Sequence, residues 1–355
     1  MYISKLLLQN FRSYQQKLIE FDSKLNLIIG PNGSGKTNIL ESIFFLASGK
    51  SFRSSSQSKL INWNSTFTSV RAKLIDDKKE EHQIEVKLIK DPQKGSISRQ
   101  FLIQNSKKTR KKYIGILKTV AFQPEDIRLI TGSPSRRRDF LDHIFSQTEW
   151  RYTSALSQYN KALKHRNELL DQVRLKTASQ TELFYWDQVL VKNSKIVHDF
   201  RTKFIRHVNQ FFSTHPDPQI NTLSFNYRPS ILTEEKLKRN YQMDLLKGYT
   251  QIGLHRDDFT LDNSIFSAPD KNLAFWGSRG QQRLAVLAVR LGQINYLEDN
   301  YQDKPILLLD DIFSELDPDH QQLVVKVCQK YQTIFTAAEP ETLKVLKEAK
   351  IIQLK

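Results

Sequence analysis

The sequence predicts an α/β fold: one lobe with a mixed sheet, joined to a second, largely helical lobe. Three observations favour this class. A glycine-rich loop stands between a strand-like and a helix-like segment, a second apolar run ends in two carboxylates, and a long stretch between them carries helical periodicity. With 355 residues the chain is longer than a single hydrophobic core usually supports, so two lobes are expected.

Short strand-like runs, several of them alternating between apolar and polar residues, fill the N-terminal part of the chain. They lie at residues 2–9, 16–21, 66–75, 82–90 and 99–104. We expect them to form a partly antiparallel sheet beside a further predicted strand at residues 25–29. The basic run at residues 106–112 is interpreted either as a solvated loop or as a segment that contacts phosphates.

A complete phosphate-binding loop occupies residues 30–37 and matches the pattern G-x-x-x-x-G-K-[ST] at every fixed position. The apolar run at 25–29 before it predicts a buried strand, and residues 38–46 after it have helical periodicity. Backbone N–H groups of such a loop bind phosphate oxygens, the lysine reaches the outer phosphates and the threonine hydroxyl ligates Mg²⁺. The residues expected to bind the nucleoside triphosphate here are Gly30, Asn32, Gly33, Ser34, Gly35, Lys36, Thr37 and Asn38.

The middle of the chain predicts a helical hairpin at about residues 150–212. Apolar residues recur there at steps of three or four, as in the seam between paired helices. The polar stretch at 176–180 interrupts this pattern and marks the turn. The arms are of unequal length and short, unlike those of a long coiled coil.

Two carboxylates, Asp310 and Asp311, end a short apolar run that predicts a central parallel strand. Ligands gather at the carboxyl ends of such strands, where the phosphate loop also lies. Asp310 is therefore expected to hold Mg²⁺ opposite Thr37, and Asp311 to orient or deprotonate the attacking water. Taken alone, two acids in this position also fit a helix N-cap. Residues 332–336 predict a second strand, with a helix between the two.

Two further segments are candidate parts of the site. Ser278, Gly280 and Gln281 begin an apolar-periodic helix, and we interpret them as a second anion site for a nucleotide held by another subunit. Gln123 ends a strand-like run and is expected to contact the metal and the γ-phosphate. The catalytic residues expected from the sequence are therefore Asp311, Lys36 and Gln123.

In their order along the chain, these segments resemble the ABC-type ATPase heads of chromosome and repair proteins, and most closely the RecF family of recombination mediators. The matching parts are the phosphate loop, a glutamine loop, a signature, the acidic strand and a Ser-Glu-Leu-Asp loop at 314–317. Nearly the whole chain is covered. Further matching segments lie at residues 10–14, 49–53, 122–126, 132–138 and 253–258.

The resemblance implies an ATP- and Mg²⁺-dependent homodimer that binds double-stranded DNA near single-strand gaps. It also implies RecO- and RecR-like partners that help load RecA, and weak ATP hydrolysis that releases the protein from DNA. Lobe I would comprise residues 1–120 and 303–355. Lobe II would comprise residues 121–302, with the signature and the hairpin arm.

The sequence departs from the general ABC pattern at three places. Arg279 replaces the first glycine of the transporter signature, and Asp311 replaces the usual, longer glutamate, which predicts slow turnover. Residues 336–338 contain no switch histidine.

For two groups of basic residues the sequence leaves two interpretations open. His255 and Arg256 are DNA or dimer contacts or buried structural residues, and the arginines at 136–138 are functional or form a salt-bridged surface.

A formal net charge of +16 predicts a polyanionic partner, and nucleic acid fits better than a membrane. The single cysteine, Cys328, excludes an intramolecular disulfide and is expected to be buried. There is no long apolar run and no signal-like N-terminus, so a soluble, cytoplasmic protein without a membrane partner is expected. Two alternative functions stay open here, an ABC-type motor of another complex and a P-loop phosphotransferase.

Overall fold

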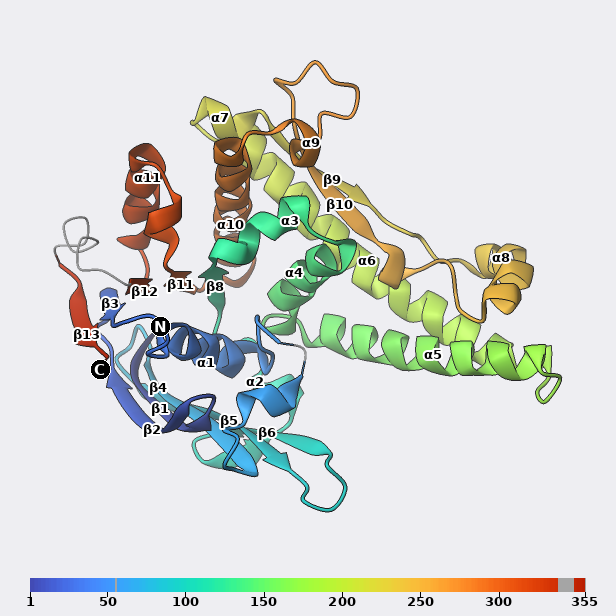
Figure 1. The fold of residues 1–355 in the computed structure, drawn as a ribbon, viewed down its shortest axis with the longest axis horizontal. Helices are drawn as coiled ribbons and strands as arrows, with labels where there is room; N and C mark the ends of the chain where they lie inside the picture. Colours follow the sequence, from blue (N-terminus) through green and yellow to red (C-terminus); the bar gives the residue numbers. More distant parts are fainter. Residues whose placement is uncertain (55, 338–347, 355) are drawn as a thin grey trace. The chain divides into compact units, whose positions relative to one another are not determined.

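The computed structural model describes residues 1–54, 56–337 and 348–354 of the chain (Figure 1). These residues fall into two compact units. Unit 1 comprises Met1–Asp126 and Gln293–Lys355, and unit 2 comprises Ile127–Gly292. The functional lobes expected from the sequence, residues 1–120 with 303–355 and residues 121–302, remain a prediction.

An antiparallel sheet of six strands forms one layer of unit 1, in the order β2-β1-β4-β5-β6-β7. Its strands are β1 (Tyr2–Phe11), β2 (Tyr14–Glu20), β4 (Phe67–Ile75), β5 (Glu81–Lys90), β6 (Ile97–Ile103) and β7 (Ser106–Lys108). The register between β1 and β4 shifts between Ile3 and Lys5. This irregularity explains why the buried apolar residues of β1 change from odd to even positions, from Ile3 to Leu6 and Leu8.

A second sheet of unit 1 is entirely parallel and has the order β13-β3-β12-β11-β8. Its strands are β3 (Leu25–Ile29), β8 (Thr119–Phe122), β11 (Ile306–Asp310), β12 (Thr333–Ala337) and β13 (Lys350–Gln353). The four apolar residues of β11 and all of β12 are buried, as in strands covered on both faces. The α/β class is confirmed, with the two strand orientations separated into different sheets.

Helix α1 (Lys36–Ser48) packs against strands of both sheets in unit 1. Most of its residues are buried, including apolar side chains on every side, which is why it carries only a weak amphipathic pattern. The other helical segments of this unit are η1 (Gln57–Leu60), α2 (Arg110–Tyr113), η5 (Ile312–Glu315) and α11 (Pro318–Cys328), and η2 (Pro124–Ile127) begins in it. Cys328 is buried, as expected, and burial raises the pKa of its thiol to about 12.

Unit 2 is mainly helical and contains a single two-stranded antiparallel sheet of β9 (Leu223–Arg228) and β10 (Asp258–Asn263) among its described residues. Helix α10 (Arg279–Tyr301) begins in this unit and ends in unit 1. The remaining elements are α3 (Arg128–Thr131), α4 (Pro134–Ser146), α5 (Trp150–Arg174), η3 (Gln180–Glu182), α6 (Leu183–Thr214), α7 (Pro218–Asn221), α8 (Glu234–Lys247), η4 (Leu254–Arg256) and α9 (Leu273–Trp276).

The helical hairpin lies where the periodicity places it, with α5 packed against the first part of the longer α6, which continues beyond it (Figure 1). The polar break between them contains Lys176 in the left-handed region, at φ 58°, and a capping box at Ser179. In that box the Ser179 amide donates to the Glu182 carboxylate at 2.9 Å. Local chemistry therefore sets both the turn and the start of the second arm.

Candidate nucleotide-binding site

The phosphate loop joins β3 to α1 in unit 1 and requires glycine at its last turn. Gly35 has φ 95°, a conformation that other residues rarely adopt. A Cβ atom there would also lie 2.5 Å from the Tyr14 hydroxyl oxygen. That hydroxyl donates to the Ser34 carbonyl at 3.2 Å, and burial raises the pKa of Tyr14 to about 12, so it stays a neutral donor.

Backbone amides of this loop are available for an anion. Within the described residues, the N–H groups of Gly33, Gly35, Lys36 and Thr37 have no backbone acceptor. The last two open helix α1, where the helix dipole also favours negative charge. The Ser34 hydroxyl is buried and has no hydrogen-bond partner in this part of the structure. These donors together form a cradle for phosphate oxygens.

The Lys36 ammonium lies over the same loop. Its Nζ donates to the carbonyl of Gly30 at 2.5 Å and to that of Pro31 at 3.0 Å, and the residue is only 9% exposed. A cation held this close to a ring of free amides adds charge to a site that already favours an anion.

The predicted metal ligands Thr37 and Asp310 are in contact. Thr37 Oγ1 donates to Asp310 Oδ1 at 3.0 Å, and the same carboxylate oxygen accepts from Thr336 Oγ1 at 2.7 Å. β11 and β12 are paired at this point, which aligns Asp310 with Thr336. A carboxylate and two hydroxyls form an all-oxygen set, the donor type that Mg²⁺ prefers, so these residues fit the ion.

Asp311 follows in an unusual conformation. Its φ is 48°, in the left-handed region, and its amide donates to Thr336 Oγ1 at 3.0 Å. Aspartate tolerates this region better than a longer side chain does. The shorter acid at this position, where the sequence pattern usually has glutamate, therefore has a backbone explanation.

Gln123 follows the last residue of β8, which pairs with β11 in the parallel sheet. Its amide donates to Asp126 Oδ2 at 3.1 Å, while its side-chain Nε2 is buried without a partner within the described residues. An unsatisfied buried amide at the carboxyl edge of the nucleotide-binding sheet marks a position that a ligand can complete.

The signature residues lie in unit 2, at the start of α10. The Ser278 amide donates to the Gln281 side chain at 2.9 Å, and the Gln281 amide donates to the Ser278 hydroxyl at 3.3 Å. This reciprocal pair is a capping box. It leaves Gly280 exposed at the first turn of the helix.

The comparisons with known proteins agree over the full length of the chain. The family described as "RecF/RecN/SMC N terminal domain" matches residues 2–354. A protein of Alkaliphilus oremlandii named "DNA replication and repair protein RecF" is 33% identical over 363 residues, covering 98% of this chain and 96% of the relative. The chain belongs to the RecF family.

Solved structures extend this likeness to three dimensions. The recombination mediator protein RecF-ATPrS of the RecFOR pathway has a TM-score of 0.85 and 28% identity, covering 100% of this chain and 96% of that one. An Smc head bound to the C-winged helix domain of ScpA has a TM-score of 0.52 and 19% identity, covering 99% and 94%, and supports the fold alone. The RecF-like fold with an ABC-ATPase head is thus confirmed.

Two RecF-family segments identified in the sequence meet beside helix α1. Arg12 forms a bidentate ion pair with the fully buried Glu41, at 2.6 and 2.9 Å, and the Ser51 hydroxyl donates to the same carboxylate. The Asn38 side chain donates to Ser13 Oγ and accepts from Arg53 Nη1. The residues of these segments alone do not predict that the two meet. Here they fix the first turns of the helix that carries the phosphate loop.

The Ser-Glu-Leu-Asp loop and the region of the missing switch histidine are described only in part. The side chains of Ser314 and Glu315 and the whole of Ala338 lie outside the described residues. Asp317 caps α11, with its carboxylate accepting from the His320 amide at 3.0 Å.

The segments at 132–138 and 253–258 join a buried polar cluster in unit 2, which we call the Asp257 cluster. Its carboxylate, 1% exposed, accepts from Arg201 Nη1 at 2.6 Å and from the Tyr227 hydroxyl at 2.6 Å. His198 and the Ser230 amide complete it. Burial opposes ionisation of Asp257, but the hydrogen bond from His198 and the neighbouring charges outweigh it, and its pKa lies below the usual value.

Among the basic residues of these segments, Arg137, Arg138 and His255 make structural contacts. Arg137 is buried and pairs with Asp258 through two bonds, of 2.5 and 2.9 Å, and Arg138 donates to the Asp257 carbonyl. His255 bonds the Tyr159 hydroxyl and the Thr250 carbonyl. Two further residues of these segments, Arg136 and Arg256, are exposed.

Asp257→Ala is expected to lower the free energy of unfolding by about 3 kcal/mol, because the buried Arg201 then keeps a single carboxylate partner, Asp142, and the other donors of the cluster lose their acceptor. Urea unfolding at neutral pH measures this. The pKa of Asp257 is lower in the folded protein than in the unfolded chain. The difference in unfolding free energy between the wild type and Asp257→Ala is therefore largest above the usual carboxyl pKa of about 4, and it shrinks as the pH falls below that value. Asp199→Ala, on the exposed face of α6, is the control and should change little. Equal stability of the two variants would contradict the structural role.

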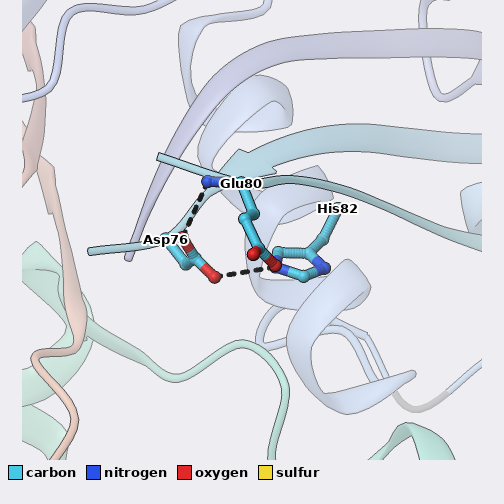
Figure 2. Close-up of side chains that lie close together, drawn as sticks. All are labelled: Asp76, Glu80 and His82. Carbon is cyan, nitrogen blue, oxygen red and sulfur yellow. Dashed lines mark hydrogen bonds and ion pairs between the residues drawn. The ribbon is translucent and has the colours of Figure 1, made fainter. Parts of the chain in front are cut away.

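A further group of metal-type ligands lies in the hairpin between β4 and β5. Asp76, Glu80 and His82 place one ligand atom each within 4.8 Å of one another (Figure 2). The Asp76 carboxylate is already used by the turn, accepting from the amides of Lys78 and Glu80 and contacting His82 at 2.9 Å. These bonds account for the cluster as turn chemistry.

No helix among the described residues has both the length and the apolar character needed to cross a bilayer.

Proposed function

We propose that this RecF-family chain is an ATP-dependent DNA-binding protein of replication and recombinational repair. ATP joins two copies on DNA near single-strand gaps, and slow hydrolysis releases them. The observation that carries the proposal is the contact of Thr37 with Asp310 beneath a complete phosphate loop, in a chain whose relatives are named RecF. A motor of another complex and a phosphotransferase have no specific observation in their favour.

The residues divide the chemistry as follows. The loop amides, with Lys36 and Asn38, bind the triphosphate, and Thr37, Asp310 and Gln123 are the residues that would hold Mg²⁺. When bound, the ion neutralises charge that develops on the phosphate oxygens. Asp311 orients the attacking water and takes up its proton. Its short side chain and constrained backbone support slow turnover.

A second copy completes each nucleotide site in this proposal. Lobe I, residues 1–120 and 303–355, offers the phosphate loop, and lobe II, residues 121–302, offers Ser278, Gly280 and Gln281 from the other copy. Supporting this, α9 lies directly before the signature and exposes two aromatic side chains. Phe275 is 75% exposed and Trp276 is 55% exposed. Large exposed aromatics beside a functional segment are typical of a protein interface.

Phe275→Ala is expected to weaken the ATP-dependent dimer about tenfold, because an aromatic anchor at an interface contributes roughly 1–2 kcal/mol or more. Sedimentation with ATP and Mg²⁺ measures the dissociation constant. Leu246→Ala on α8 removes another large exposed side chain, 73% exposed, and should leave the dimer unchanged. Identical dimerisation of the two variants would remove α9 from the interface.

Nucleic acid is the partner that the net charge of +16 favours. The RecFOR pathway named for the similar structure supports RecO- and RecR-like proteins as further partners, and through them the loading of RecA. We assign these roles by family membership, without a contact surface on this chain.

Retention of a gapped DNA duplex in a gel-shift assay, with and without ATP, tests the proposal. ATP should increase both DNA binding and self-association, and DNA affinity should fall steeply with salt. DNA binding and oligomeric state that do not respond to ATP would refute it.

A further inference from the structure

Two arginines of unit 1 lie partly buried at the end of helix α1 and have no counter-ion within the described residues. Arg99 lies on β6 and Arg110 opens α2, which packs on that strand (Figure 1). Desolvation lowers the pKa of Arg110 below its usual value. Desolvation, with the charge of Arg110, lowers the pKa of Arg99 to about 10. Neither arginine forms an ion pair within the described residues, and both bury an Nε atom that has no hydrogen-bond partner there.

Strand alternation shows how unusual the position of Arg99 is. It shares one face of β6 with Ile97 and Phe101, which pack into the hydrophobic core of unit 1. Arg99 also approaches the end of α1, where a Cβ on Gly49 would lie 3.2 Å from its Nη1. Arg110 has a single weak hydrogen bond, from Nη2 to the Ser48 carbonyl at 3.4 Å.

An isolated buried cation is costly, and two neighbouring ones repel each other. Structural arginines in this chain avoid that cost by pairing, as Arg12 does with Glu41 and Arg137 with Asp258. Arg99 and Arg110 have no such carboxylate within the described residues, so an anion from outside the chain would complete the pair. The planar guanidinium fork matches the bidentate geometry of a phosphate as well as that of a carboxylate.

The surroundings select a polymer of phosphates over a single free one. Arg110 belongs to the basic run 106–112, which contains no acidic residue. Its lysines are all exposed, and they are Lys107, Lys108, Lys111 and Lys112. They extend along β7, the edge strand of the antiparallel sheet, and into α2. A row of exposed cations beside a partly buried pair suits successive phosphates of a nucleic acid backbone.

We infer that Arg99 and Arg110 together bind a backbone phosphate of duplex DNA, with the adjacent lysines on neighbouring phosphates. The identity of the ligand rests on the proposed function. This site lies at the opposite end of α1 from the phosphate loop, about 20 Å along the helix at 1.5 Å per residue. One buried helix thus connects the nucleotide to a DNA phosphate.

Arg99→Met and Arg110→Met test the inference, with Lys78→Met as the control. Lys78 is an exposed lysine in the turn between β4 and β5, at the far end of β5 from the Leu88 that pairs with Arg99. Each arginine variant should weaken duplex binding about tenfold in the presence of ATP, the expected loss of a charge-assisted hydrogen bond. The slope of log K against log salt should also fall by about 0.9, as for one lost phosphate contact.

Thermal unfolding without DNA separates a binding role from a structural one. Removing a partly buried charge that has no ion-pair partner within the described residues should raise the melting temperature of each arginine variant by about 2 °C. A lower melting temperature in both would show that the arginines stabilise the end of α1, and would overturn the inference.

Three other outcomes are equally decisive. If the wild type binds DNA with ATP but the arginine variants match Lys78→Met in affinity and salt slope, the site is wrong and the proposed function stands. If the wild type does not bind DNA with ATP, the proposed function itself fails. Inorganic phosphate, added with saturating ATP, tests whether the arginine pair binds a free phosphate ion instead of a DNA phosphate. Stabilisation of the wild type by phosphate, with DNA affinity unchanged in the variants, would reassign the pair to a small anion.

Discussion

Lys36→Ala is expected to abolish ATP binding and, with it, ATP-dependent dimerisation. The ammonium is the cation held over the loop amides, donating to two loop carbonyls. Loss of its charge-assisted contacts to phosphates should weaken ATP binding by about two orders of magnitude. Fluorescence of a labelled ATP analogue measures affinity, and sedimentation with and without ATP measures the dimer.

The control for this variant is Lys24→Ala, which removes an exposed lysine just before β3 and should leave both measurements unchanged. Circular dichroism checks that Lys36→Ala stays folded, since the side chain is largely buried. A Lys36→Ala protein that still dimerises with ATP would contradict the composite site. A Lys36→Ala protein that dimerises to the same extent with and without ATP would show that the dimer does not depend on the nucleotide.

Features encoded by neighbouring residues could be predicted from the sequence. The phosphate loop is one, because its glycines, lysine and threonine are adjacent and the flanking periods change from strand to helix. The hairpin of α5 and α6 is another, since its polar break contains the capping box of Ser179. The contact of Thr37 with Asp310 followed from a general rule, that the carboxyl ends of parallel strands meet.

Features that depend on distant pairing could not be predicted. The sequence of a strand does not indicate which sheet it joins. The separation of parallel from antiparallel strands is therefore seen only in the three-dimensional structure. The Asp257 cluster joins Arg201, Tyr227 and Ser230 from different elements, and no spacing along the chain brings them together. Arg99 did leave a signal, a charge on the apolar face of an alternating run.

Asp311→Asn should preserve ATP binding, slow hydrolysis and accumulate dimers. Asparagine tolerates the left-handed conformation at φ 48° as well as aspartate does, so the backbone and its bond to Thr336 should persist. The amide cannot accept the proton of the attacking water, which should reduce the single-turnover rate about 100- to 1,000-fold. Rapid-quench hydrolysis and sedimentation after ATP addition measure the two effects.

The neighbouring acid provides the informative comparison. Asp310 accepts hydrogen bonds from Thr37 and Thr336, so Asp310→Asn should weaken ATP–Mg²⁺ binding as well as hydrolysis and should not accumulate dimers. Asp319→Asn, exposed on α11, is the neutral control. The opposite behaviour of two adjacent aspartates would assign nucleotide binding to the first and release to the second. If Asp311→Asn hydrolyses ATP at the wild-type rate, Asp311 is not the base, and the left-handed turn at φ 48° only positions Asp310.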